Sequence, residues 1–493
     1  MKYTIDSIKK EQAYHHSVLM VMMKAIIEVY GMDVNVRVGN SLNQGFFVYL
    51  GDTSSPISTS DISRIKEHMD AIIRADIPIE TVTMTNEEAM KLWKEYDVPE
   101  KVRLLGQRDP EEKLEISDMG GYKNCFFSDM VPSTSYVDTY EIRKYKNGFL
   151  LRVPYMLSGG KVSEYRDDDK LYEAFADSKK MRKNMGLDYL SDLNEAIRAG
   201  RGAELIVEAE KLQQQEIEEI AEEIAEKGRR LILIAGPSSS GKTTFAKRLC
   251  AAIGEKTSQE PIYLGTDDYF VNRAETPIGP DGKPDYEGLS ALDIELFNSQ
   301  MKALLNGESV DAPEYDFVSG EKKFGVRTIA PLEGQALVIE GIHSLNDDLT
   351  PDIPVEDKYK IYISPLTRIG IDRHNRLSTT DARMLRRMVR DNQFRGTDAA
   401  GTLSNWCNVR RGENENIFPY SSYADHVFNS SLVYETALLK TYAQPLLEEI
   451  SEGAPEYEEA QRMIAFLKYF DRISTETAKN VPDNSLLREF IGK

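Results

Sequence analysis

The residues best suited to chemistry form the stretch GPSSSGKTT, which follows the apolar run LILIA and precedes a helical pattern. Its spacing is that of a phosphate-binding loop between a strand and a helix. Glycines let backbone amides turn toward a phosphate chain, and the helix N-terminus adds a favourable dipole. We expect nucleoside-triphosphate binding by Gly236, Pro237, Ser238, Ser239, Ser240, Gly241, Lys242, Thr243 and Thr244. Lys242 would reach the β and γ phosphates, and the Thr243 hydroxyl would hold Mg²⁺.

This loop leaves the reaction open, because GTPases, ATPases and small-molecule kinases all use it. The donor is therefore ATP or GTP, and the acceptor must be sought in other residues.

Acidic residues end two further predicted strands. Asp267 and Asp268 follow IYLG, and Glu340 closes the apolar run ALVI. Ligands of open parallel sheets bind at such carboxyl ends. Glu340 is placed as a Walker-B acid that holds Mg²⁺ directly or through water. Asp267 is a candidate to accept a proton from an attacking hydroxyl and to contact Mg²⁺, whereas Asp268 is typical of a turn.

A cluster of arginines follows in RRMVRDNQFRG, at Arg386, Arg387, Arg390 and Arg395. Their spacing of three to five residues places them on one face or at the end of one helix. Arginines that close over a triphosphate would neutralise charge in the transition state. The alternative is a salt-bridged surface helix.

Strands and helices alternate from Leu231 onward, with strands predicted at LILIA, PIYLG, ALVIE and YKIYIS. This alternation predicts a parallel sheet with helices on both faces. The preceding part mixes helices, over 12–30 and from an N-cap at Ser60, with alternating strands. We expect an α+β domain over 1–190, a connecting helix with an acidic face over 191–228, a P-loop domain over 229–445 and a helical extension over 446–493.

The overall composition excludes several classes of protein. The net charge of −20 disfavours a general nucleic-acid surface, which needs a basic face. No apolar run approaches 18 residues and no signal peptide is visible, so we expect a cytoplasmic chain without a membrane partner. The three cysteines, Cys125, Cys250 and Cys407, lack the spacing of a structural zinc site.

The segment 231–445 resembles the uridine kinase branch of the phosphoribulokinase/uridine kinase family. The matching pieces, in family order, are GPSSSGKTT, TDDYF, DYEGLSALD, PEYDFVSG, VIEGI, RRMVRDNQFRG and YSSYADHVF. The resemblance implies that Asp267 is the catalytic aspartate and that Thr243 and Glu340 are Mg²⁺ positions. It also implies that Glu287 binds ribose hydroxyls and that Tyr315 and Phe317 lie beside the base. The implied lid arginines are Arg387, Arg390 and Arg395.

Three positions depart from the family pattern. Gly320 stands where uridine kinases have a histidine that contacts the pyrimidine, Thr397 replaces a second lid arginine, and Asn405 replaces a lid glutamine. Losing a buried polar partner changes specificity, because its mate is left unpaired. These departures put pyrimidine specificity in doubt. His343 is either a substitute donor or a structural histidine.

The first 190 residues resemble the second N-terminal domain of threonyl-tRNA synthetase, through HHSVLMVMMKAIIEVYG, NQGFFVYLGD, IKEHMDAIIRADIPIE and MVPSTSYV. That domain implies a metal-like editing site with two histidines, a cysteine and a further histidine. Here His16 and Cys125 remain, but Met20 and Met130 replace the other two. A thioether is a poor Zn²⁺ ligand beside one histidine and one cysteine. We expect an inactive domain with an architectural, dimerising or regulatory role.

The first hypothesis is therefore an α/β P-loop kinase, preceded by a mixed α+β synthetase-like domain, that uses ATP and Mg²⁺. It would phosphorylate a hydroxyl of a nucleoside-like small molecule, and a homo-oligomer is compatible with this. Two alternatives remain open. One is a kinase for a sugar or sugar phosphate, and the other is a regulatory ATPase linked to RNA through the N-terminal domain.

Overall fold

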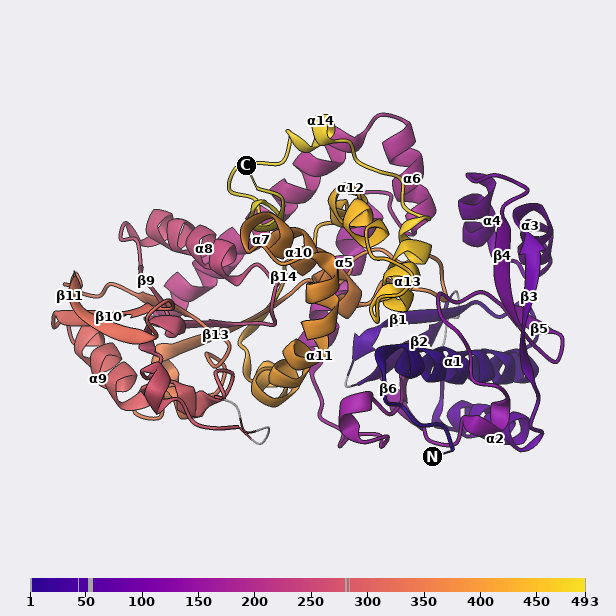
Figure 1. Cartoon of the computed structure of the whole chain (residues 1–493), viewed down its shortest axis with the longest axis horizontal. Helices are drawn as coiled ribbons and strands as arrows, with labels where there is room; N and C mark the ends of the chain where they lie inside the picture. Colours follow the sequence, from indigo (N-terminus) through magenta and orange to yellow (C-terminus); the bar gives the residue numbers. More distant parts are fainter. Residues whose placement is uncertain (1, 43, 52–55, 280–281, 283, 493) are drawn as a thin grey trace.

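The structure is a computed structural model that describes residues 2–42, 44–51, 56–279, 282 and 284–492. The N-terminal elements form one end of the molecule and the strand-rich part after residue 230 forms the other (Figure 1). Helices from the C-terminal part of the chain lie between them. Among the described residues, no helix is both long and apolar enough to cross a bilayer.

The N-terminal part contains two antiparallel sheets and four helices. The first sheet has the order β1-β2-β7-β6, with β1 (Val36–Leu42), β2 (Gly45–Leu50), β6 (Glu141–Tyr145) and β7 (Gly148–Arg152). The second has the order β3-β4-β5, with β3 (Ile79–Thr85), β4 (Lys113–Met119) and β5 (Tyr122–Asn124). The helices are α1 (Ile8–Tyr30), α2 (Thr59–Arg74), α3 (Asn86–Glu95) and α4 (Pro99–Gly106).

Local sequence signals explain where these helices begin. The hydroxyl of Ser58 accepts the amide of Asp61, and the Asp61 carboxylate accepts the amide of Ser58, which makes a capping box. The prediction that Ser60 caps this helix is therefore wrong by two residues, because only Ser58 has an acid at the third helical position. Helix α1 is buried along most of its length and packs against α2 and the first sheet.

Three helices connect the two ends: α5 (Asp169–Asn184), α6 (Leu190–Arg198) and α7 (Gly202–Lys227). The segment 191–228 thus holds most of α6 and all of α7. The apolar face of α7, including Ile217, Ile220 and Ile224, packs in one core with Ile232 and Phe245 of the following domain. Helix α7 is therefore a layer over the second domain as well as a connection.

That domain is built on a five-stranded parallel sheet of order β14-β13-β8-β12-β9, which confirms the predicted α/β class. The strands are β8 (Leu231–Ala235), β9 (Ile262–Gly265), β12 (Leu337–Glu340), β13 (Lys358–Ser364) and β14 (His426–Asn429). Its helices are α8 (Lys242–Thr257), α9 (Ile294–Leu305), α10 (Thr379–Phe394), α11 (Ala399–Asn416) and α12 (Glu435–Glu448).

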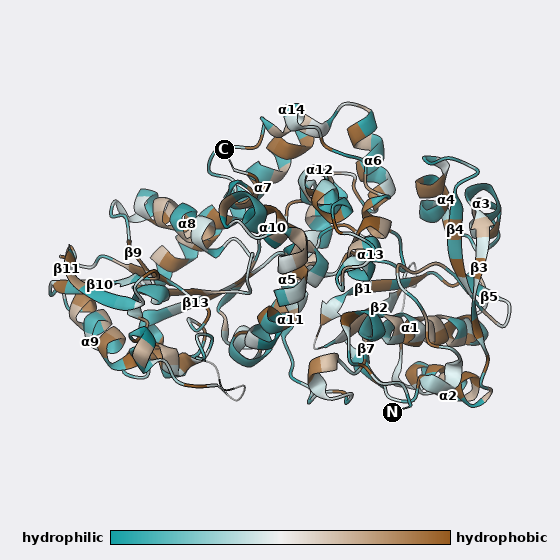
Figure 2. Cartoon of the chain, in the orientation of Figure 1, coloured by the Kyte–Doolittle hydropathy of each residue, from teal (hydrophilic) through white to brown (hydrophobic). Residues whose placement is uncertain are grey.

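Two additions complete the domain. An antiparallel hairpin, β10 (Val310–Asp316) and β11 (Glu321–Ile329), stands at the far end of the molecule, and its outer strand is mostly exposed and hydrophilic (Figure 2). The C-terminal extension carries α13 (Tyr457–Leu467), α14 (Thr475–Ala478) and α15 (Arg488–Ile491). A single hydrophobic core joins Leu104 and Leu193 to Trp406, Leu467 and Phe490, so the extension is packed into the molecule.

Candidate active site

The phosphate loop lies between the end of β8 and the start of α8. Gly241 precedes the helix in the left-handed region with φ +87°. A Cβ on Gly236 would lie 2.1 Å from the Ile363 carbonyl oxygen, so only glycine fits there. The Lys242 ammonium donates to the carbonyls of Gly236 and Pro237 at 2.9 and 3.3 Å. The lysine therefore lies folded over its own loop, beside the unpaired amides of the helix N-terminus.

Oxygen donors suited to a divalent cation meet beside this loop. The Thr243 hydroxyl donates to Glu340 Oε1 at 2.8 Å, and the Tyr263 hydroxyl donates to the same oxygen at 3.2 Å. The other carboxylate oxygen, Glu340 Oε2, is buried and has no hydrogen-bond partner among the described residues. A threonine hydroxyl, an orphaned carboxylate oxygen and the nearby Asp267 fit Mg²⁺, which binds through one or two carboxylates together with substrate phosphates.

Asp267 lies on the 3₁₀ turn Thr266–Tyr269, directly after β9. Gly341, which follows β12, has space for no side chain because a Cβ would lie 1.9 Å from the Thr266 hydroxyl. This close approach brings the ends of β9 and β12 together. Burial and the charge of Glu340 raise the pKa of Asp267, whereas Lys242 acts in the opposite direction. A raised pKa suits a carboxylate that must accept a proton.

The arginines of α10 divide into two groups. Arg386 is fully buried, pairs with Glu435 at 2.6 Å and donates to the carbonyls of Ser239 and Ser240. Arg387 donates to the Ser238 hydroxyl at 2.8 Å. These two arginines therefore contact the phosphate loop itself.

The other two predicted lid arginines lie further along the helix. Arg390 pairs with Asp391 at 2.8 Å, and the half-exposed Arg395 lies 3.6 Å from the same acid. The structure thus brings Arg387 to the loop and leaves Arg395 at the rim.

One pair at this site was missed by sequence reasoning. Glu413 of α11 accepts the Ser238 amide at 2.9 Å and the Arg383 guanidinium at 2.6 Å, and both charged side chains are buried. The pair ties α10 and α11 to the phosphate loop. RRGENEN around Glu413 carries no local signal for this role, because its partners are distant in sequence.

The residues predicted to bind the acceptor lie at the same end of the sheet. Glu287 is close to α11, since a Cβ on Gly412 of that helix would lie 3.1 Å from its carboxylate. Desolvation by the surrounding chain and the charges of Glu413 and Asp285 raise the pKa of Glu287. Tyr315 is buried and its ring lies 5.1 Å from that of the exposed Phe317 at the tip of the hairpin.

The local structure explains why glycine occupies the position where a histidine that contacts the base is expected. Gly320 has φ +75°, and a Cβ there would lie 2.7 Å from the Arg273 side chain. The Arg273 guanidinium donates to the Phe317 carbonyl at 2.7 Å, so it braces the hairpin tip. His343 is buried with an unpartnered Nδ1, and burial lowers its pKa to about 4. Asn405 lies exposed on α11.

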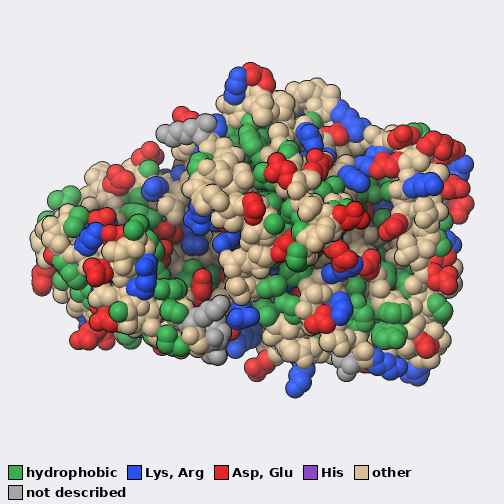
Figure 3. Space-filling model, in the orientation of Figure 1, with side chains coloured by type: hydrophobic (Ala, Val, Ile, Leu, Met, Phe, Trp, Pro, Cys, Tyr) green, Lys and Arg blue, Asp and Glu red, His purple; other side chains and the backbone are tan. Residues whose placement is uncertain are grey.

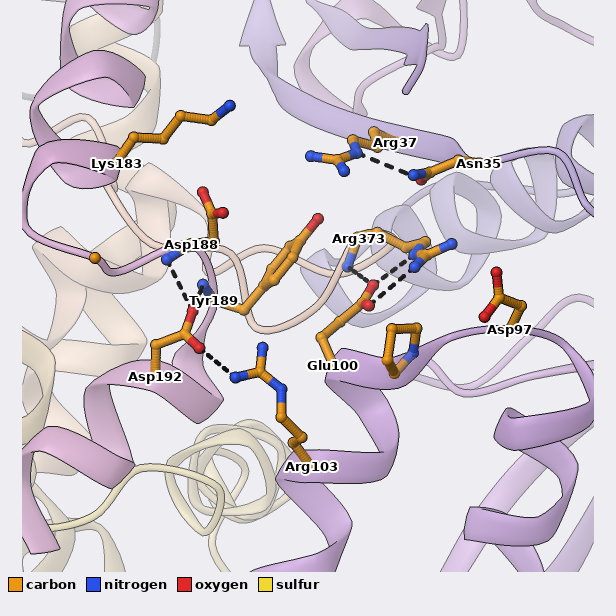
Figure 4. Close-up of a pocket in the computed structure, with 12 residues that line it drawn as sticks. Asn35, Arg37, Asp97, Glu100, Arg103, Lys183, Asp188, Tyr189, Asp192 and Arg373 are labelled. Carbon is orange, nitrogen blue, oxygen red and sulfur yellow. Dashed lines mark hydrogen bonds and ion pairs between the residues drawn. The ribbon is translucent and has the colours of Figure 1, made fainter. Parts of the chain in front are cut away.

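Seen from outside, the molecule is hollowed between the sheet-bearing end and the central helices, and Lys and Arg side chains line this hollow (Figure 3). A separate cavity of about 460 Å³ lies between the N-terminal part and the α5–α6 turn (Figure 4). Two ion pairs line it, Arg373–Glu100 and Arg103–Asp192, each at 2.5 Å. That arrangement is typical of a polar contact between domains.

The expected remnant of an editing site lies in the N-terminal part. His16 hydrogen-bonds Ser128 at 2.5 Å and stacks on Phe126 with ring centroids 5.0 Å apart. Burial lowers the pKa of His16 to about 3. The Cys125 thiol donates to the Glu115 carbonyl at 3.7 Å, and burial raises its pKa to about 11. Within the described residues, no three His, Cys, Asp or Glu side chains cluster as a metal site would require.

Comparison with known proteins matches both parts of the chain. Residues 231–437 match the model of the phosphoribulokinase/uridine kinase family. A uridine kinase from Deinococcus deserti is 28% identical over 209 residues, which are 42% of this chain and 91% of the relative. A uridine kinase from Halobacterium salinarum is 28% identical over 194 residues, which are 39% of this chain and 76% of the relative.

The N-terminal part matches a different protein. A threonine–tRNA ligase from Caldanaerobacter subterraneus is 28% identical over 139 residues, which are 28% of this chain and 21% of the ligase. This match and the family model cover different parts of one chain. Residues 231–437 are therefore similar to the phosphoribulokinase/uridine kinase family, and the chain joins this region to an N-terminal part similar to a threonine–tRNA ligase.

Proposed function

We propose that the chain transfers the γ-phosphoryl group of ATP to a hydroxyl of a nucleoside or a closely related small molecule. The observation that carries this proposal is the convergence of three sets of residues at one end of the parallel sheet. They are the phosphate loop, the Asp267–Glu340 acid pair and an acceptor wall of Glu287, Tyr315 and Phe317. A switch ATPase has no need of an acceptor wall.

Donor binding falls to the loop and the basic side chains around it. On ATP binding, Lys242 would exchange the carbonyls of Gly236 and Pro237 for the β and γ phosphates. The Ser239 and Ser240 hydroxyls are buried, have no hydrogen-bond partner in the part of the chain that the structure describes, and could donate to the nucleotide. Arg387 is close enough to the loop to offset charge that develops on the transferred group. A divalent cation held by Thr243, Asp267 and Glu340 would add positive charge at the phosphates.

The transfer itself needs one proton acceptor. The acceptor oxygen bonds to the γ-phosphorus as the bond from that phosphorus to the β–γ bridging oxygen of ATP breaks. The hydroxyl proton passes to the Asp267 carboxylate, and ADP leaves with the bridging oxygen. Positioning and charge neutralisation supply most of the catalysis in such transfers, so Asp267 acts chiefly by orienting the hydroxyl.

Glu287 would accept hydrogen bonds from adjacent hydroxyls of the acceptor, and Tyr315 and Phe317 would contact a flat ring. The two uridine kinase relatives support a nucleoside acceptor. Because Gly320 packs against Arg273 and offers no side chain, the base of the acceptor would bind without a contact from the expected histidine. We therefore expect tolerance toward the base and selectivity for the ribose diol.

The test is a screen of the full chain with ATP, Mg²⁺ and panels of ribonucleosides, 2′-deoxynucleosides, sugars and sugar phosphates, with ADP release as the readout. We expect a ribonucleoside-dependent signal. E287Q should lower kcat/KM for ribonucleosides about tenfold, the cost of one hydrogen bond to a charged group, while changing it little for 2′-deoxynucleosides. ADP release that ignores every acceptor but responds to tRNA would refute the proposal.

A further inference from the structure

The last part of the chain crosses the phosphate loop. Leu486 lies so close that a Cβ on Gly241 would be 3.1 Å from its Cδ2. Leu486, Leu487 and Phe490 are fully buried. The segment 485–491 is therefore docked beside the first turn of α8, although it lies outside the region that matches the kinase family model.

Helix α15 places a carboxylate in that first turn. Glu489 Oε2 lies 3.5 Å from the Thr244 hydroxyl, and Glu489 Oε1 lies 3.8 Å from Arg390 Nη1. Thr244 is the last residue of the phosphate-loop motif, and the N-terminus of α8 attracts anions. Glu489 thus lies where an anionic group of a bound nucleotide would be expected.

Several contacts hold the segment in this position. The Ser485 hydroxyl donates to Glu210 of α7, and the Phe490 ring lies 5.1 Å from the guanidinium of Arg386. The Arg488 guanidinium donates to the carbonyl oxygens of Pro482 and Gly492 at 3.3 and 3.0 Å, which ties the segment to itself. Anchors therefore lie on both sides of Glu489.

A nucleotide phosphate chain and the Glu489 carboxylate cannot share this turn without like-charge repulsion, which costs affinity. We propose that Glu489 and α15 are a built-in competitor for the nucleotide site, which withdraws when a nucleotide binds. This inference rests on the proposed function, because it requires the loop to bind a nucleotide. For α15 to move, Phe490 would have to leave its contact with Arg386, while the hydrogen bond of Ser485 would keep the preceding residues attached to α7.

Nucleotide binding to the full chain tests this without any acceptor. Titration with a fluorescent ADP analogue should show about tenfold tighter binding for E489Q than for the natural chain, since removing the charge favours the open state. The matched control is E476Q, because Glu476 is exposed in the same extension and pairs with Lys479. Equal or weaker binding by E489Q would overturn the inference and make α15 a fixed wall of the site.

Hydrogen exchange of residues 485–492 supplies the second readout. ADP should speed exchange in this segment of the natural chain, and slower or unchanged exchange would overturn the inference. If the natural chain binds ADP and transfers phosphoryl groups while the segment stays protected, only this inference fails. If neither the natural chain nor E489Q binds any nucleotide, the proposed function fails with it.

Discussion

The phosphate-loop site and the His16 site both contain polar residues inside the fold, but the two sites differ in whether those polar groups have hydrogen-bond partners. At the phosphate loop, the hydroxyls of Ser239 and Ser240 and one oxygen of Glu340 are buried without partners. In the N-terminal part, the His16 ring stacks on Phe126 and forms a hydrogen bond with the Ser128 hydroxyl. Buried polar groups are normally satisfied.

This difference separates a site whose unpaired polar groups a ligand could complete from a site whose polar groups are already paired within the fold. Orphaned donors and acceptors cost stability unless a ligand completes them, whereas satisfied ones stabilise the fold. A resemblance in sequence can thus point to two sites in one chain whose buried polar groups differ in their hydrogen bonding.

The variant K242A should have the largest effect on the phosphate-loop site, and it tests whether this site binds and uses a nucleotide. Removing the ammonium should lower phosphoryl transfer about 10³-fold, the upper range for the loss of one preorganised charge-stabilising donor. Thermal stability should change little, since the hydrogen bonds of the Lys242 ammonium to described residues go to carbonyls of its own loop. The control is K247A, an exposed lysine of the same helix. Equal losses in the two variants would contradict the role of Lys242.

The next effect should come from the paired acids of the turn after β9. D267N should lower kcat about 10²-fold through loss of the carboxylate that orients the hydroxyl and accepts its proton. Asp268 also has a pKa raised by burial, but it accepts a backbone hydrogen bond from Tyr315. D268N is therefore the matched control, and it should keep most of the activity in steady-state assays. A larger loss in D268N would reverse the assignment.

In the N-terminal part the expected effect is on stability. H16A should lower the free energy of unfolding by about 2 kcal/mol, because it removes a half-buried ring that stacks on Phe126. H68A, at an exposed histidine of α2 that pairs with Glu28, should change it by less than about 0.5 kcal/mol. Urea unfolding measures both. A variant H16A of normal stability that loses activity would show that this site still functions.

The smallest difference between two matched variants concerns the hairpin tip. Gly320 and Gly325 both have positive φ, at +75° and +77°, but only Gly320 faces a neighbour, Arg273. G325A should cost about 1 kcal/mol through backbone strain alone. G320A should cost roughly 1 kcal/mol more, because Arg273 must move, and it should also raise the KM of the acceptor. Equal costs in thermal unfolding would show that Arg273 is free to rearrange.

The sequence predicts the parts of this site that local patterns encode. The phosphate loop, the acids at the ends of β9 and β12, and the alternation of strands and helices are all readable over short stretches. The structure places them together because parallel strands end at one edge. Thr243 and Glu340, 97 residues apart, meet in this way.

What the sequence does not predict depends on contacts between distant segments. Glu413 and Glu489 reach the loop from 175 and 245 residues away, and each lies in a stretch with no recognisable motif. The same holds for Gly320, because the lack of space for a side chain there is due to Arg273, which lies in another turn. Helix α7 shows the intermediate case, because its apolar face is evident from periodicity but the domain that it covers is not.

The C-terminal extension has a consequence for how the protein is made. Its residues Phe466, Leu487 and Phe490 complete the core to which Leu193 and Leu205 of α6 and α7 contribute. A ribosome releases the early helices long before it synthesises these late partners. The nascent chain must therefore carry exposed apolar faces on α6 and α7 until residues 466–490 have been synthesised, which makes this protein a candidate for chaperone assistance during synthesis.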